Sequence, residues 1–77
     1  MNVDKKEILQ LIKTSVPEVD ITIIKYDTIL RDNGIDSLDM FNIFLAIEEK
    51  YGVKISDDDV EKLKSIDLIC NFLSEAK

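Results

Sequence analysis

The sequence predicts an all-α fold, a small antiparallel bundle of three main helices and one short helix, with a long loop between helices one and two. Three observations support this prediction. Apolar residues recur at the i, i+3, i+4 spacing of helical faces. The chain breakers are confined to Pro17, Gly34 and Gly52. One segment alone has the β-branched composition of a strand, and a lone strand is not viable. With 77 residues, the chain is expected to form a single domain, residues 1–77.

The first helix is expected from about Asp4 to Val16, because Asp4 and Glu7 resemble a capping pair. Pro17 disfavours helical geometry at the residue before it and ends the helix. The apolar face consists of Ile8, Leu11 and Ile12.

The long loop is expected to span Pro17 to Asp36. Val19–Ile24 has strand propensity, but it is interpreted as part of an ordered connection, with a short helical turn at Asp27–Leu30 and a turn at Asn33-Gly34. The residues expected to anchor the loop to the core are Ile23, Ile24, Ile29 and Leu30.

The second helix is expected to begin at Asp36 or Ser37 and to end at Lys50 or Tyr51, with Gly52 as its left-handed C-cap. A short third helix follows Ser56 and ends near Leu63, with three aspartates in its first turn. The last helix follows Ser65, and its expected core face is Ile66, Ile69, Cys70 and Leu73.

The second helix has two apolar faces. Its core face is expected to contain Met40, Ile43, Phe44, Ile47 and Tyr51. The nearly opposite face carries Leu38, Phe41 and Leu45, flanked by Asn42, Glu48 and Glu49. Two interpretations remain open for this second face. Either the long loop covers it, or it is a docking surface with an acidic rim that receives basic patches of partner proteins.

Charge and composition exclude several classes of function. The net charge of −6 argues against binding to nucleic acid and favours a soluble monomer. The absence of histidine excludes Ser-His-Asp and Cys-His catalysis and histidine metal sites, so we expect no enzyme and no metal site. The aspartates at 57–59 lack the rest of an EF-hand calcium loop. No apolar run approaches the length of a membrane span and the start of the chain is charged, so we expect a cytoplasmic protein without membrane insertion.

Ser37 lies at the start of the second helix, where backbone N–H groups and the helix dipole favour negative charge. A phosphate esterified to its hydroxyl would be stabilised there. Helix capping alone is the competing interpretation, because Asp and Ser are common at helix starts.

Two sequence blocks resemble acyl carrier proteins. Asp32–Asp39 reads D-N-G-I-D-S-L-D and is similar to the attachment motif D-L-G-x-D-S-L-D. Ala46–Asp57 reads A-I-E-E-K-Y-G-V-K-I-S-D and is similar to the block A-L-E-E-x-F-G-x-x-I-S-D. The resemblance covers nearly the whole chain and is strongest from Thr28 to Leu73.

The resemblance implies that Ser37 carries 4′-phosphopantetheine, installed from coenzyme A by a phosphopantetheinyl transferase that uses its own magnesium. The arm would hold acyl groups as thioesters for acyl-transferring and acyl-modifying enzymes of fatty acid or related biosynthesis, while the carrier catalyses nothing. Acyl chains are tucked between the helices of similar proteins. Candidate lining residues here are Ile43, Phe44, Ile47 and Phe72.

The resemblance also assigns a surface for docking to enzymes. On the second helix it comprises Asp36, Leu38, Asp39, Leu45, Glu48 and Glu49, with Phe41 and Asn42 on the same surface. Asp57 and Glu61 match acidic positions on the third helix.

Three positions depart from the family pattern. Asn33 replaces Leu, Asn42 replaces the Glu usual in carriers of general fatty acid synthesis, and Phe41 is bulkier than the usual Val. An alternative is therefore a dedicated carrier for a polyketide, peptide or modified-lipid pathway. A third possibility is an acidic helical adaptor without a prosthetic group, which would bind partners through its exposed apolar face.

Overall fold

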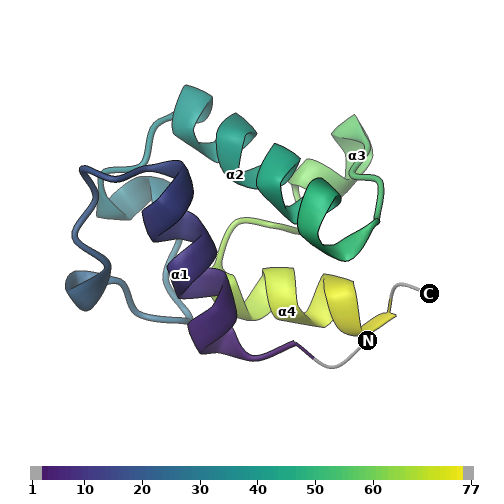
Figure 1. Cartoon of the computed structure of the whole chain (residues 1–77), viewed down its shortest axis with the longest axis horizontal. Coiled ribbons are helices and arrows are strands. Elements are labelled where there is room, and N and C mark those ends of the chain that lie inside the picture. Colours follow the sequence, from purple (N-terminus) through teal and green to yellow (C-terminus); the bar gives the residue numbers. More distant parts are fainter. Residues whose placement is uncertain (1–2, 76–77) are drawn as a thin grey trace.

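The computed structural model describes residues 3–75, and every regular element within them is helical. The four α-helices are α1 (Lys5–Ser15), α2 (Ser37–Tyr51), α3 (Asp57–Val60) and α4 (Ile66–Glu75). Two 3₁₀ turns, η1 (Ile21–Ile23) and η2 (Leu30–Asn33), lie in the connection between α1 and α2. The arrangement in Figure 1 confirms the predicted all-α bundle of three main helices and one short helix.

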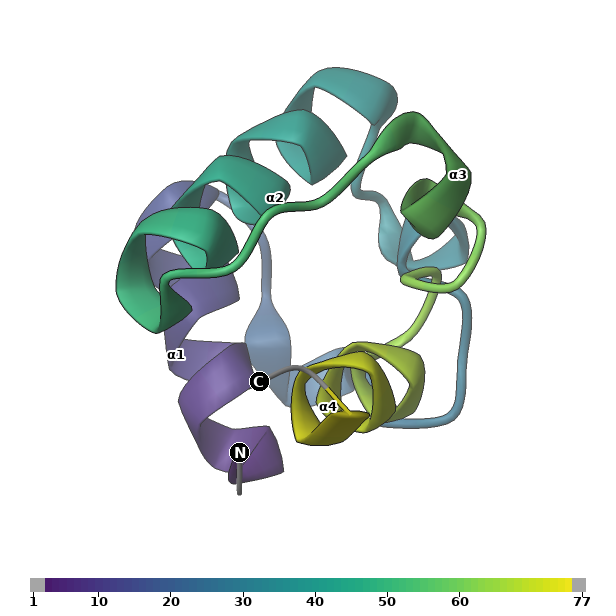
Figure 2. The same ribbon diagram turned by 90° about the vertical axis from the view of Figure 1, so that its right-hand side faces the viewer.

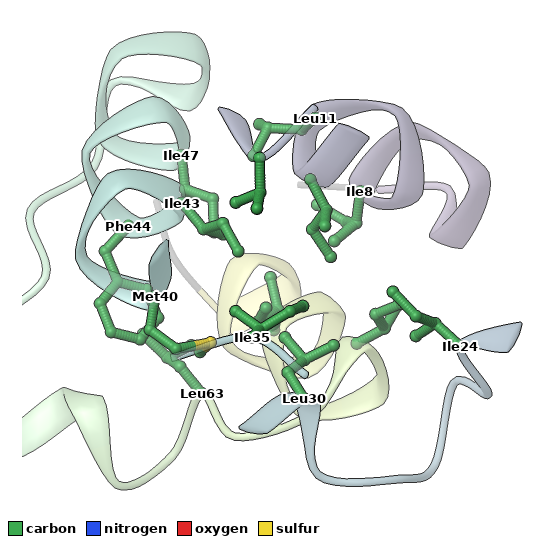
Figure 3. Packing of buried hydrophobic residues seen from close by; sticks show 14 of the residues in the cluster. Ile8, Leu11, Ile24, Leu30, Ile35, Met40, Ile43, Phe44, Ile47 and Leu63 are labelled. Atoms are coloured by element: carbon green, nitrogen blue, oxygen red, sulfur yellow. The ribbon is translucent and has the colours of Figure 1, made fainter. Parts of the chain in front are cut away.

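Helices α1 and α2 pack side by side and run in opposite directions. Near the start of α1, the Glu7 carboxylate lies 3.5 Å from the Nζ of Lys50, which is near the end of α2. Between these two ends, Ile43 and Ile47 of α2 face α1, as Figure 3 shows. The fully buried side chains on these faces remove apolar surface from water, which is the main stabilising term for a chain of this size.

Helix α4 closes the core from a third direction. Its start is fixed by Ser65, whose hydroxyl accepts a hydrogen bond from the Leu68 N–H at 3.2 Å, and by an ion pair of 2.9 Å between Lys5 and Asp67. Burial of the predicted α4 face is confirmed, and burial also raises the pKa of the Cys70 thiol. Cys70 is therefore a small core residue, as expected.

The loop between α1 and α2 is anchored differently from the prediction. Ile24 and Leu30 are buried, as predicted, but Ile23 and Ile29 are exposed, so those two assignments are wrong. The 3₁₀ turns set which neighbour faces inward, and this choice was not visible in a run of similar apolar residues. Two buried anchors were missed, Val19 and Ile35.

Two long-range backbone hydrogen bonds attach this loop to the start of α4 and to the segment before it. The Leu30 N–H donates to the Lys64 carbonyl at 2.8 Å, and the Asp67 N–H donates to the Tyr26 carbonyl at 2.9 Å. The short helical turn expected at 27–30 instead begins at Leu30. These bonds place η2 beside the α3–α4 connection.

The element boundaries otherwise follow the sequence closely. Gly52 ends α2 in the left-handed conformation, with φ of 66°. Helix α3 ends at Val60, earlier than expected, and Leu63 is buried in the connection that follows. In Figure 2, α1 and α3 lie on opposite sides of the molecule. Across residues 3–75, no helix has both the length and the apolar character needed to cross a bilayer.

Candidate functional site

Ser37 is the first residue of α2, and it does not cap the helix. The cap is Asp36, whose Oδ1 accepts a hydrogen bond from the Asp39 N–H at 2.8 Å. Ser37 is exposed, and its hydroxyl makes no hydrogen bond or ion pair within the described residues 3–75. The interpretation of Ser37 as a plain cap is therefore wrong, and its side chain is exposed to solvent.

The turn before Ser37 is held by three hydrogen bonds to the residues that precede it. Gly34 has a φ of 87°, a left-handed conformation that favours glycine, and its N–H donates to the Arg31 carbonyl at 3.4 Å. The Asn33 amide donates to the Thr28 hydroxyl and to the Ile29 carbonyl, both at 3.0 Å. Asn33, which departs from the family pattern, thus ties η2 to the loop that precedes it.

A cleft of about 680 Å³ opens beside Ser37 between α2, α3 and η2. Its floor is apolar and buried, and consists of Met40, Phe44 and Leu63. Its other apolar lining residues are more exposed, namely Ile29, Phe41, Leu45, Ile55 and Val60. Its charged lining residues are Arg31, Asp32, Glu48, Asp57, Glu61 and Lys64. The cleft therefore offers an apolar surface surrounded by charge, next to a free hydroxyl.

Of the four residues expected to line a space for an acyl chain, Phe44 alone lines this cleft. Ile43 and Ile47 are fully buried in the core against α1. Phe72 lies on α4 and lines a separate hollow of about 360 Å³, together with Leu68. Ile43 and Ile47 lie on the side of α2 that faces α1, whereas Phe44 reaches the cleft between α2 and α3.

The second apolar face of α2 is open to solvent. The exposed fractions of Leu38, Phe41 and Leu45 are 76%, 60% and 44%. The interpretation that the long loop covers this face is wrong, because the buried anchors of the loop carry it to the core side instead. An exposed apolar patch of this kind is typical of an interaction site.

The predicted docking residues fall into two groups. Those that line the cleft with Ser37 are Phe41, Leu45, Glu48, Asp57 and Glu61. Those outside the cleft lining are Asp36, Leu38, Asp39, Asn42 and Glu49. Asp39 is half-buried, and the other four are exposed.

Glu48 has a structural contact that the sequence did not indicate. Its Oε2 accepts a hydrogen bond of 2.8 Å from the Ile55 N–H, seven residues along the chain. This bond ties α2 to the segment that leads into α3. Glu48 is half-buried, so it is less available to a partner than Glu49, which is exposed.

Several cleft residues were missed by sequence reasoning. Arg31 and Lys64 are basic groups in a largely acidic lining, and Ile55 and Val60 come from the α3 side. A possible signal for Arg31 was its rarity, since it is the one arginine in the chain.

Comparison with known proteins agrees with this geometry. The family model described as "Phosphopantetheine attachment site" matches residues 6–73. The chain belongs to the acyl carrier protein family. It is 43% identical over 49 residues to the acyl carrier protein of Campylobacter jejuni subsp. jejuni, and this match covers 64% of each chain. It is 41% identical over 56 residues to that of Campylobacter lari, covering 71% of this chain and 73% of the relative.

The chain thus spans 64% of the length of the Campylobacter jejuni relatives that it matches. Proteins of the acyl carrier family are carriers without catalytic activity of their own, and the prosthetic group of this carrier is covalently attached 4′-phosphopantetheine. The exposed Ser37 hydroxyl, without an internal hydrogen bond and at the edge of an apolar cleft, fits a group that is linked through a phosphate ester and bears a long flexible arm.

Proposed function

We propose that Ser37 is the attachment residue and that this carrier presents acyl intermediates as thioesters to enzymes of fatty acid or related acyl biosynthesis. The observation that carries the proposal is the free hydroxyl of Ser37 at the edge of the cleft. Asp36 already performs the capping role, so the serine is not needed to stabilise the helix start.

The residues of the chain have separate roles in this proposal. Asp36 and the buried side chains of Ile35 and Met40 hold the start of α2 in place, so that the Ser37 oxygen faces outward when it forms its ester bond. The terminal thiol of 4′-phosphopantetheine supplies the thioester chemistry. The apolar floor of the cleft, including Phe44, gives an acyl chain a surface on which to be sheltered from water.

The proposed partners are a phosphopantetheinyl transferase and acyl-handling enzymes with basic docking patches. The exposed side chains of Leu38, Phe41 and Leu45 provide the apolar centre of the contact. Surrounding carboxylates, with the net charge of −6, steer basic surfaces toward it and raise the association rate. We further propose a monomeric, cytoplasmic carrier, since strong net charge opposes self-association.

Intact mass measures the attachment directly. The protein is incubated with coenzyme A and a promiscuous transferase, and the wild type should gain the mass of one phosphopantetheine group. Ser37→Ala should gain nothing. Ser56→Ala is a matched control, because Ser56 is another exposed serine at a helix start and should leave loading intact. An unmodified wild type, beside a control carrier that is loaded, would instead support the acidic adaptor.

A dedicated pathway is the second candidate, favoured by Asn42 and Phe41 on the exposed face. Replacing a carboxylate with a neutral amide weakens attraction to basic patches mainly through the association rate. Mass spectrometry of the carrier purified from its native host would identify the attached group. Saturated acyl chains of regular length would favour general fatty acid synthesis, and any other acyl class would favour a dedicated system.

A further inference from the structure

The edge of the cleft beside Ser37 holds the one arginine in the chain. Arg31 lies on η2 and lines the same cleft as Ser37, although the two residues come from different elements. The rest of the charged lining is mostly acidic, with Lys64 as the one other basic residue. A guanidinium at this position is therefore unusual within the local charge pattern.

The backbone of Arg31 is held in place. Leu30, its neighbour, is fully buried and donates its N–H to the Lys64 carbonyl at 2.8 Å. The Arg31 carbonyl itself accepts the N–H of Gly34. Because one bond attaches η2 to the segment before α4 and the other closes the turn that leads to α2, the base of the Arg31 side chain keeps a defined position relative to the start of α2.

The guanidinium of Arg31 has no partner within residues 3–75. No carboxylate there forms an ion pair with it, although Asp32 is adjacent in sequence and lines the same cleft. The other basic lining residue, Lys64, already pairs with Glu61 at 2.9 Å. Arg31 is thus the one uncommitted cation in the described lining of the cleft.

A phosphate ester at Ser37 would add negative charge to a surface that already contains Asp32, Asp36 and Asp39. An uncommitted guanidinium at the same cleft offsets that repulsion. Arginine suits the task because its planar donors match the oxygens of a phosphate group. We propose that Arg31 is a positioning residue that binds the phosphodiester of the prosthetic arm and directs the arm toward the cleft, an inference that rests on the proposed attachment at Ser37.

Selective labelling makes the contact visible, because arginine labelled with ¹⁵N yields a single side-chain Nε–H signal in this chain. The protein is recorded by NMR before and after loading, and intact mass is measured on the same sample. After loading at low salt, the Nε–H signal should shift and its exchange with water should slow. Both changes should diminish at high salt, because the Debye screening length falls from about 30 Å at 0.01 M to about 3 Å at 1 M salt. Ser37→Ala, treated identically, should show neither change.

The ³¹P signal of the arm provides a second measurement. Loss of a surface contact of this strength corresponds to about a two- to fivefold fall in the ratio of bound to unbound phosphate. Arg31→Gln should therefore make the phosphorus of the loaded carrier more mobile, with faster averaging of its signal. Lys62→Gln is the matched control, since Lys62 is an exposed cation outside the lining of this cleft, and it should leave the phosphorus signal unchanged.

The outcomes separate the two proposals. No gain in mass overturns attachment at Ser37, and the inference with it. A gain in mass with an unmoved Nε–H signal overturns the role of Arg31 alone. A signal that moves only when a partner enzyme is added shows that Arg31 binds the partner and also overturns the inference. Equal effects of Arg31→Gln and Lys62→Gln on the phosphorus signal would show that net charge causes the change, and would contradict a specific contact of Arg31.

Discussion

The two faces of α2 are both apolar, yet they have opposite surroundings. One face, with Ile43 and Ile47, is fully buried against α1, and the other, with Leu38 and Phe41, is exposed. Burial explains the first face, because it stabilises the fold. Exposure of the second face stabilises nothing in the isolated chain, so its apolar residues point to contacts with other molecules.

A similar difference separates the α1 side of the molecule from the α3 side. On the α1 side, helices pack directly against one another, with α1 between α2 and α4. On the α3 side, a cleft separates the helices, and single hydrogen bonds such as Glu48 to Ile55 position the intervening segment. Helix α2 thus contributes both to the closely packed core beside α1 and to the cleft beside α3.

The largest expected effect contrasts two residues of α2 that differ by two positions. Ile47→Ala removes a fully buried side chain and should lower the free energy of unfolding by about 3–4 kcal/mol. Leu45→Ala, on the exposed side, should change it by at most about 0.5 kcal/mol. Urea unfolding followed by circular dichroism measures both. Similar losses for the two variants would contradict the division of α2 into a core face and an open face.

Glu48 and Glu49 are adjacent acidic residues with different contacts, so they test the difference between the structural and the open parts of α2. Glu48→Ala removes the hydrogen bond to the Ile55 N–H and should lower the free energy of unfolding by about 2 kcal/mol. Glu49→Ala should be nearly neutral for stability, but it should slow loading by the transferase at low salt. Stability that is unaffected by Glu48→Ala would show that this hydrogen bond does not hold the α3 side in place.

The main elements could be predicted from the sequence because their signals are local. Pro17 and Gly52 end helices through their own backbone preferences, and the apolar spacing in α4 identifies its core face. Ser37 was predicted as the attachment residue from a motif of consecutive residues, which needs no knowledge of the fold.

The cleft could not be predicted, because its walls meet through contacts between distant residues. The position of η2 depends on the hydrogen bond that the Leu30 N–H donates to the Lys64 carbonyl, and that of α3 depends on the bond that the Ile55 N–H donates to the Glu48 carboxylate. Neither bond leaves a pattern in the neighbouring sequence. Ile23 and Ile29 were misplaced for a related reason, since a β-branched run does not reveal which neighbour turns inward in a 3₁₀ segment.

Tyr51, at the end of α2, should make the free energy of unfolding depend on pH. Burial, together with the nearby Glu7 carboxylate, raises the pKa of Tyr51 to about 12 from 10.0. The unfolded chain therefore loses this proton first, so the contribution to stability is intact below pH 10 and is lost as the pH rises toward 12. With allowance for partial exposure, the loss should be about 1–2 kcal/mol.

Tyr51→Phe has no proton to lose and should be less sensitive to alkaline pH than the wild type. Urea unfolding at pH 8 and at pH 11 measures the difference for each protein. An equal loss of stability in both proteins between these two values would show that Tyr51 titrates as freely in the folded chain as in the unfolded one.

The smallest expected effect concerns the turn that leads from η2 to Ser37. Gly34 has a φ of 87°, and a Cβ added there would meet nothing within 4 Å. The cost of Gly34→Ala is therefore backbone strain alone, about 1 kcal/mol in the free energy of unfolding. Gly34→Asn should recover part of that cost, because asparagine tolerates the left-handed conformation better than alanine.

The rates of transferase loading then test whether this turn positions Ser37 as well as stabilising the fold. If the turn positions Ser37, transferase loading should follow the order wild type, Gly34→Asn, Gly34→Ala, in line with backbone strain. A Gly34→Ala variant that is destabilised but loads at the wild-type rate would show that the start of α2 keeps its position without the turn. The support for Ser37 would then come from the Asp36 cap and the buried side chains on either side of it.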